Sequence, residues 1–105
     1  MVPIEVLELI SGSRVRKKTL LTLYHSFIPM YVSQIAKEVP TSPRNVSAAL
    51  KELKGLNLVA QVPHRRNAKL KFWRITEEGR RVVEEMGLVK NIPVVRRYDY
   101  EIENR

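Results

Sequence analysis

Residues 32–58 constrain the fold of this 105-residue chain more than any other segment. Apolar residues recur at helical intervals of three and four positions in each half of the segment. Between the halves, Ser42 is a good helix N-cap, and Pro43 suits the first turn of a helix because its missing N–H is not needed there. The sequence therefore predicts two short amphipathic helices joined by a tight turn, at residues 32–39 and 43–54.

Positive charge is concentrated in residues 41–74, which hold eight lysines and arginines against one acid. Residues 1–40 hold five against three, and residues 75–105 hold six against seven. Nearly all of the net charge of +8 therefore falls on the second predicted helix and the segment after it. Evenly spread charge would favour only solubility, whereas a concentrated basic surface is typical of proteins that bind a polyanion.

Composition excludes several classes of protein. A chain of this length forms one domain with a modest core, and it has no apolar run long enough to cross a membrane. It has no cysteine, which excludes disulfides, thiolate catalysis and cysteine metal sites. His25 and His64 lie far apart in the sequence, and no nucleophile–base pair is evident. We therefore expect a cytoplasmic protein with no membrane partner, no catalytic or metal site and no cofactor.

Three further helices are predicted from apolar spacing and capping residues. They are residues 2–10, 14–25 and 77–86. Ser13 caps the second of them and Thr76 caps the third. The short connection before residues 32–58 is apolar enough for burial, and the residues that we expect to be buried there are Phe27, Ile28 and Tyr31.

A basic β-hairpin is predicted after the two central helices. Residues 58–62 and 70–75 have strand character, and the polar turn between them contains Asn67, which can adopt a positive φ. The sequence leaves open which face of the second strand is buried, because two apolar pairs alternate along it. These pairs are Leu70 with Phe72, and Trp73 with Ile75.

The order of elements resembles that of winged helix-turn-helix transcription regulators, in the broad group that contains the ArsR-like and MarR-like families. The opening at Val6–Ile10, Ser13–Arg16 and Leu20–Leu23 is similar to that of ArsR-like chains. Their helix-turn-helix and first wing strand are matched by Val32–Val39, Asn45–Leu53 and Gly55–Val59. Phe72–Gly79 is similar to the wing-to-helix junction of MarR-like and PadR-like chains. The resemblance implies an α+β, mostly α fold: a winged helix-turn-helix with a two-stranded β-hairpin wing, spanning residues 1–87.

The second helix of a helix-turn-helix enters the major groove of DNA. On a helical wheel its outward face presents Arg44, which can bridge guanine O6 and N7, and Ala48, which can touch a thymine methyl group; Asn45 beside them can pair with adenine. Short hydroxyl side chains at its start suit phosphate, and arginines at the hairpin tip suit phosphate or an A·T-rich minor groove. The alternative is that these are ordinary solvated surfaces. The predicted DNA-binding residues are Thr41, Ser42, Arg44, Asn45, Ser47, Ala48, Lys51, Arg65, Arg66 and Lys69.

Two surfaces remain apolar after a core is built, namely the first helix and the tail at residues 88–105. The tail alternates apolar and acidic residues in a strand-like pattern and is too apolar for a disordered end. Because two-fold dimers read two half-sites, we expect a homodimer with the tail as a dimerisation arm. The alternatives are that the tail packs on its own domain or is disordered. The predicted interface residues are Val6, Leu7, Ile10, Val94, Tyr98, Tyr100 and Ile102.

The leading hypothesis is a regulator of transcription that binds double-stranded DNA and represses by occupancy, because the chain carries no separate activation domain. The alternative is a winged-helix module that binds protein or RNA in a transcription, replication or RNA-processing assembly. A small-molecule effector that binds between helices is left open, since no residue pattern supports or excludes one.

Overall fold

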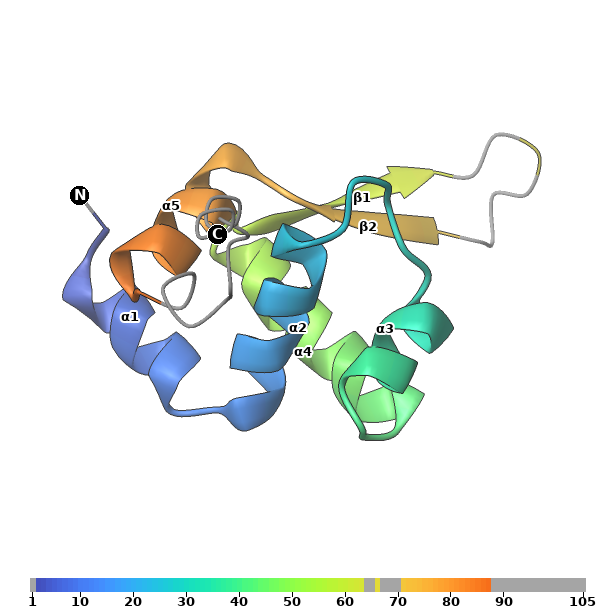
Figure 1. Ribbon diagram of the computed structural model, residues 1–105, viewed down its shortest axis with the longest axis horizontal. Helices are drawn as coiled ribbons and strands as arrows, with labels where there is room; N and C mark the ends of the chain where they lie inside the picture. The colour runs from blue at the N-terminus through green and yellow to red at the C-terminus, as the bar shows by residue number, and fades with distance from the viewer. Residues whose placement is uncertain (1, 64–65, 67–70, 88–105) are drawn as a thin grey trace, which may run out of the picture.

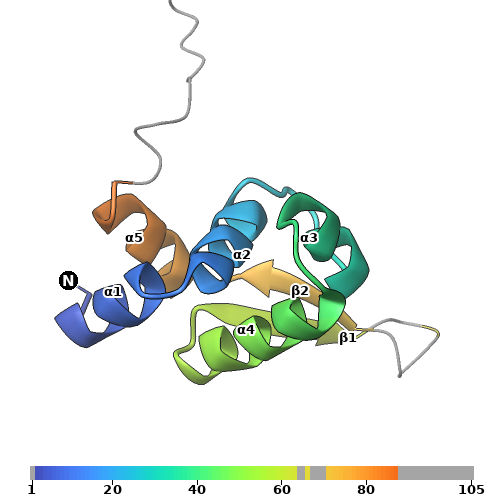
Figure 2. The ribbon, with the colours of Figure 1, turned by 90° about the horizontal axis from the view of Figure 1, so that it is seen from below.

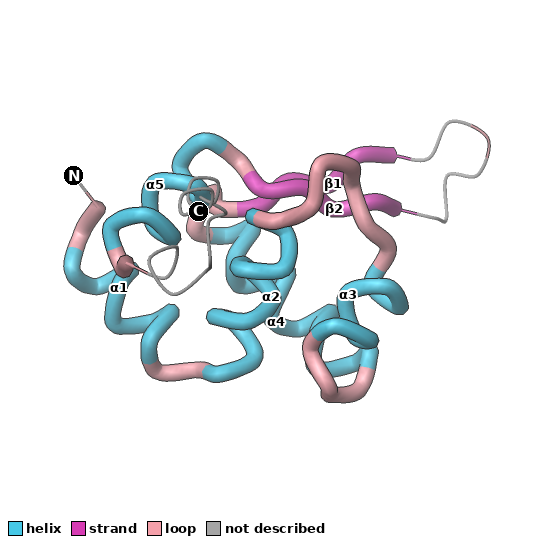
Figure 3. Tube along the Cα trace, in the orientation of Figure 1, coloured by secondary structure: helices cyan, strands magenta, loops and turns pink. Residues whose placement is uncertain are grey.

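Five helices and a two-stranded antiparallel hairpin form the part of the chain that the computed structural model describes, which is residues 2–63, 66 and 71–87. In chain order they are α1 (Ile4–Ser11), α2 (Arg14–Tyr24), α3 (Val32–Glu38), α4 (Pro43–Gly55), β1 (Val59–Pro63), β2 (Lys71–Ile75) and α5 (Glu77–Glu85) (Figure 1). The elements and their types are those expected, and most ends differ by one or two residues. The fold is therefore mostly helical with a β-hairpin wing, a winged helix-turn-helix (Figure 3).

Helix α2 lies at the centre of the molecule and packs against α1, α3, α4 and α5. In Figure 2, α4 runs along one side of the molecule, and the strands β1 and β2 lie toward the end where α4 begins. Figure 1 agrees, because α3 and the start of α4 lie at the same end of the molecule as the end of β1 and the start of β2. The start of α4 and these strand ends therefore lie at the same end of the molecule.

The core is built from the apolar faces that the helical spacing indicates. Val46, Leu50 and Leu53 on α4 have no exposed surface, and Leu20 and Leu23 on α2 are at most 1% exposed. Hydrophobic burial of this kind contributes about 1.5–3 kcal/mol per large side chain. The inward face of α4 is therefore fixed, and so is the identity of its outward face.

Three predicted N-caps are confirmed by hydrogen bonds. The Ser13 hydroxyl accepts from the backbone N–H of the third helical residue of α2 at 3.2 Å, and Ser42 does the same for α4 at 3.2 Å. Thr76 caps α5 by accepting from the Gly79 N–H at 3.0 Å. Each bond satisfies a backbone donor that has no partner inside its own helix.

The connection between α2 and α3 differs from the prediction. Phe27 is fully exposed and Ile28 is 70% exposed, so the expectation that they are buried is wrong. The connection is attached through Met30 instead, whose N–H donates to the Trp73 carbonyl at 2.9 Å and whose carbonyl accepts from the Trp73 N–H at 2.8 Å. Tyr31 is half-buried. Because this bridge fixes only the end of the connection, the two residues before it project outward.

The hairpin pairs Val59 with Ile75 and Gln61 with Trp73 in antiparallel register. Trp73 is 4% exposed and Ile75 is 7% exposed, so the face carrying these two residues is the buried one. Asn57 precedes the hairpin with φ 64°, which turns the chain out of α4. Leu70 and Asn67, on which the other expectations for the hairpin fall, lie outside the described residues.

Helix α5 is joined to α2 by a polar contact at the surface. The Tyr24 hydroxyl donates to a Glu84 carboxylate oxygen at 3.0 Å, and the Arg80 guanidinium lies 5.2 Å from the centre of the Tyr24 ring. Partial burial, this hydrogen bond and the negative charge of Glu84 raise the pKa of Tyr24 above its ordinary value. Tyr24 therefore stays protonated as a donor to Glu84 at neutral pH.

Candidate nucleic-acid interface

The outward face of α4 is exposed as the helical wheel predicts. Arg44, Ala48 and Lys51 are exposed, and the buried residues Val46 and Leu50 lie between them in sequence. Neither Arg44 nor Lys51 takes part in a hydrogen bond or an ion pair with another residue in the described part of the chain. We call Arg44, Ala48 and Lys51 the outer face of α4. It presents two cations and one methyl group to solvent.

Two predicted site residues contact each other at the start of α4. The Asn45 side-chain amide donates to the Thr41 hydroxyl at 2.9 Å. The Ser42 hydroxyl is also engaged, because it accepts the capping hydrogen bond from the Asn45 N–H. An Asn side chain reads adenine with its carbonyl oxygen and one amide hydrogen, and the Asn45 amide, which has two hydrogens, gives only one of them to Thr41. These contacts place the three side chains together beside Arg44.

A groove of about 560 Å³ lies between α4, the start of α3 and the hairpin. Its polar wall includes residues that the sequence analysis did not select. The groove is lined by Tyr31, Val32, Ser33, Ser47, Lys51, Gln61, Lys71 and Trp73. Residues 61, 71 and 73 could have been found from the hairpin register, since Gln61 pairs with Trp73 and alternate residues of a strand share one face.

Further cations lie on the hairpin and at the end of α4. Lys71 and Arg66 are exposed, and the Lys54 ammonium at the end of α4 donates to the Gln61 side chain at 3.1 Å. Arg74 donates to the carbonyl of its neighbour Ile75 in the same strand at 3.3 Å. The predicted tip residues Arg65 and Lys69 lie outside the described residues. The described strands therefore extend the basic surface of α4 toward the tip.

The predicted dimer interface changes in one respect. Ile10 has no exposed surface, because it belongs to the core of its own protomer, so it is not an interface residue. Val6 and Leu7 are half-buried and pack against the same core. Larger apolar exposure on α1 comes from Ile4 and Leu9. The four tail residues of the prediction, Val94, Tyr98, Tyr100 and Ile102, lie outside the described part of the chain.

Within the described ranges, no three histidine, aspartate or glutamate side chains come close enough to hold a metal ion. No helix in the same ranges has the length and apolarity needed to span a membrane. His25 is exposed at the end of α2, and its ring makes an edge contact with Tyr24 at 5.3 Å. His64 lies outside these ranges.

Solved structures with a similar fold include three bacterial proteins. The structure of MepR from S. aureus in a complex with DNA shares 20% identity, with a TM-score of 0.68 over 93% of this chain and 81% of that one. YusO from Bacillus subtilis shares 21% identity, with a TM-score of 0.70 over 91% of this chain and 67% of that one. A mutant of ZitR from Lactococcus lactis shares 19% identity, with a TM-score of 0.65 over 87% of this chain. The chain spans only 61% of the length of that ZitR chain.

At this level of identity the likeness to solved structures concerns the fold. A search of curated proteins found no match to the sequence. A family model described as EarA-like matches residues 6–86, which include α1 from Val6, the remaining helices, the hairpin and the outer face of α4. Since that match covers most of the sequence, the chain belongs to the EarA-like family.

Proposed function

We propose that this protein is a transcription regulator that binds double-stranded DNA through α4 and the hairpin. The observation that carries the proposal is the outer face of α4, which exposes Arg44 and Lys51 without partners in the described residues and lies beside the hairpin. The concentration of charge in residues 41–74 supports it. The structure of MepR with DNA, which has a similar fold, gives further support.

In this proposal α4 lies in the major groove and its first two turns read base edges. Arg44 bridges O6 and N7 of a guanine, Ala48 contacts a thymine methyl group, and Asn45 pairs with an adenine through its carbonyl oxygen and the amide hydrogen that Thr41 does not use. Ser47 and Lys51 border the groove between α4 and the hairpin, where they bind phosphate oxygens. Thr41 and Ser42 at the start of α4 also bind phosphate, because their hydroxyl groups keep a hydrogen to donate.

The hairpin contacts the flanking backbone or the adjacent minor groove. Arg66, Arg65 and Lys69 carry this contact, of which Arg66 is described and exposed. Lys71 continues the same basic surface toward the groove beside α4. An arginine suits a narrow A·T-rich minor groove, where the negative potential is strongest.

We further propose a homodimer that acts as a repressor. A single winged domain reaches few base pairs, and a two-fold dimer doubles the site that is read. We propose that α1 contributes Val6 and Leu7 to the interface between the protomers. The tail completes this interface with Val94, Tyr98, Tyr100 and Ile102. Repression follows if the dimer occupies DNA that polymerase needs.

The salt dependence of duplex binding tests the proposal. The logarithm of the binding constant is expected to fall with the logarithm of salt concentration, with a slope of about −0.9 for each phosphate that the protein neutralises. A dimer doubles the slope of a monomer. Titrations of a labelled duplex at several salt concentrations measure it, and a slope near zero would contradict DNA binding. Equal binding of duplex DNA and RNA would instead favour an interaction module.

A further inference from the structure

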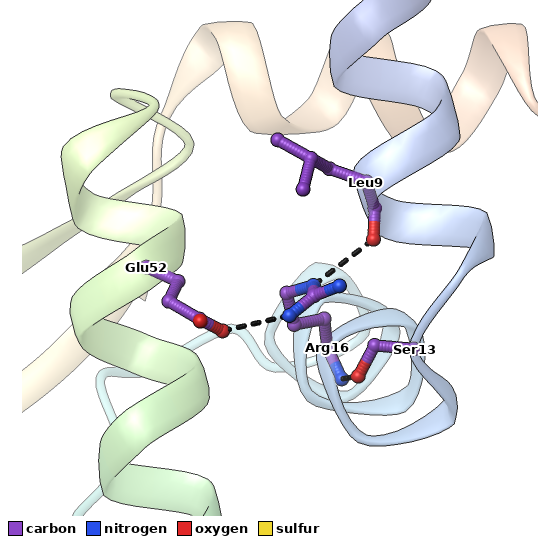
Figure 4. A network of polar contacts seen from close by, with 4 residues as sticks. All are labelled: Leu9, Ser13, Arg16 and Glu52. Carbon is purple, nitrogen blue, oxygen red and sulfur yellow. Dashed lines mark hydrogen bonds and ion pairs between the residues drawn. The ribbon is translucent and has the colours of Figure 1, made fainter.

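The guanidinium group of Arg16 joins three helices. Its Nε donates to the Leu9 carbonyl at the end of α1 at 2.9 Å, and its Nη1 donates to Oε1 of Glu52 on α4 at 2.9 Å. Figure 4 shows Arg16 lying between these two acceptors, while its backbone N–H is held by Ser13. The Arg16 side chain is only 20% exposed, against 57% for Glu52. We call this set of contacts the Arg16 brace.

Glu52 is the only acid in the basic segment 41–74. A carboxylate on a helix that binds DNA weakens the attraction to phosphate, so its charge alone opposes the proposed function. The brace gives this carboxylate a different role, because it connects α4 to α2 and, through the same guanidinium, to α1. An exposed ion pair contributes little stability on its own. The contribution of the Arg16–Glu52 pair is therefore to orient α4 relative to α2, and not to stabilise the fold.

The direction in which α4 points its outer face depends on how the helix is rotated about its axis. Apolar contacts of Val46, Leu50 and Leu53 decide which face of α4 meets the core, but hydrophobic contact has no preferred direction and leaves a range of rotation about the helix axis. A guanidinium fork is directional, since its planar N–H groups fix two acceptors at once. The Arg16 brace is thus a rotational constraint on the helix that carries Arg44 and Ala48.

We propose that Arg16 is a positioning residue for DNA reading. It sets the rotation of α4 relative to α1 and α2, and so determines how well the protein discriminates between base sequences, without touching DNA itself. The proposal rests on the proposed function of α4. It replaces the simplest view of a cation near the start of α2, which is direct contact with a phosphate.

Glu52→Gln separates positioning from charge, because a pure charge effect changes the affinity for all duplexes and a positioning effect changes the ratio of affinities between duplexes. If only charge matters, removal of a carboxylate strengthens binding to every duplex. If the brace positions α4, the variant loses discrimination between a duplex selected by the wild type from a random pool and a scrambled duplex of the same length. We expect the ratio of the two affinities to fall roughly fivefold, because the glutamine amide oxygen still accepts from Arg16 but the hydrogen bond is no longer assisted by charge.

Arg16→Lys tests the same point while keeping the positive charge. A single ammonium group cannot reproduce the planar fork that reaches Leu9 and Glu52 together, so the discrimination ratio is expected to fall as in Glu52→Gln. The salt slope is expected to stay as in the wild type, because no phosphate contact is lost. Arg14→Gln is the control: it removes an exposed cation from the same turn of α2 and leaves the brace and the discrimination ratio intact.

A distance measurement reports on the brace without DNA. Because the chain has no cysteine, Glu5→Cys in α1 and Ala48→Cys in α4 give two spin-label positions. We expect the label distance distribution to broaden in Arg16→Lys and Glu52→Gln and to be unchanged in Arg14→Gln. Unaltered distributions together with tighter, equally selective binding by Glu52→Gln would overturn the proposal. A wild type that selects no duplex would refute the proposed function and, with it, a role of Arg16 in specificity, whatever the distances show.

Discussion

Gly79→Ala is expected to destabilise the folded protein by about 3 kcal/mol, the upper range for overpacking of a close-packed site. A Cβ atom at Gly79 would lie 2.2 Å from the Leu58 carbonyl oxygen and 2.7 Å from Cγ1 of Ile75. The Leu58 carbonyl cannot turn away without loss, because it accepts the Thr76 N–H at 3.0 Å. The added methyl group therefore forces α5 away from the base of the hairpin.

Gly55→Ala is the matched control for this prediction. Gly55 is also a helical glycine, but a Cβ there meets no atom of the described residues within 4 Å. The higher helix propensity of alanine then stabilises the protein by up to about 1 kcal/mol. Urea unfolding of the two variants measures both effects through the transition midpoint at constant slope. A Gly79→Ala midpoint at or above that of the wild type would show that α5 does not pack as closely as described.

Arg44→Ala is expected to lower the ability of the protein to discriminate between DNA sequences, and this is the second large effect. Loss of a bidentate contact to guanine costs about 1–3 kcal/mol of discrimination at one base pair, which corresponds to about fivefold to 150-fold. Stability is expected to be unchanged or slightly higher, because Arg44 lies in the first turn of α4, where a cation opposes the helix dipole. Binding to the selected duplex and to duplexes with single substitutions measures the loss position by position.

Arg81→Ala provides the comparison for Arg44→Ala. Arg81 is an exposed arginine on α5 with a weak ion pair to Glu78 at 3.6 Å, so its removal changes the net charge by the same amount. We expect Arg81→Ala to keep the discrimination of the wild type. If both variants weaken all duplexes equally, Arg44 contributes charge alone and does not read a base.

Local sequence rules predicted those parts of the fold in which local and tertiary preferences agree. The caps Ser13, Ser42 and Thr76 and the inward face of α4 follow from residue type and period, and the structure confirms them. The burial of Phe27 and Ile28 was predicted from apolarity alone. It failed because the bridge between Met30 and Trp73, a contact between distant segments, decides where that connection attaches.

The candidate site also divides into features that local sequence predicts and features that depend on contacts between elements. The exposure of Arg44, Ala48 and Lys51 follows from a helical wheel, since it depends only on which side of α4 faces the core. The assignment of Ile10 to a dimer interface failed because an apolar face gives no indication of which partner covers it. The hydrogen bond of Arg16 to Glu52 joins residues far apart in sequence, and its bond to Leu9 crosses from α2 to α1, so no helical or strand pattern could indicate either of them.

Selection of bound duplexes from a pool of random sequences tests most directly whether this protein reads DNA through α4. We expect the full chain to enrich a palindromic motif whose half-sites lie about one helical turn, or a multiple of it, apart, as a two-fold dimer of winged domains requires. Guanine is expected within each half-site, at the position contacted by Arg44. A pool that stays random after repeated rounds, with duplex DNA and RNA retained equally, would contradict the account.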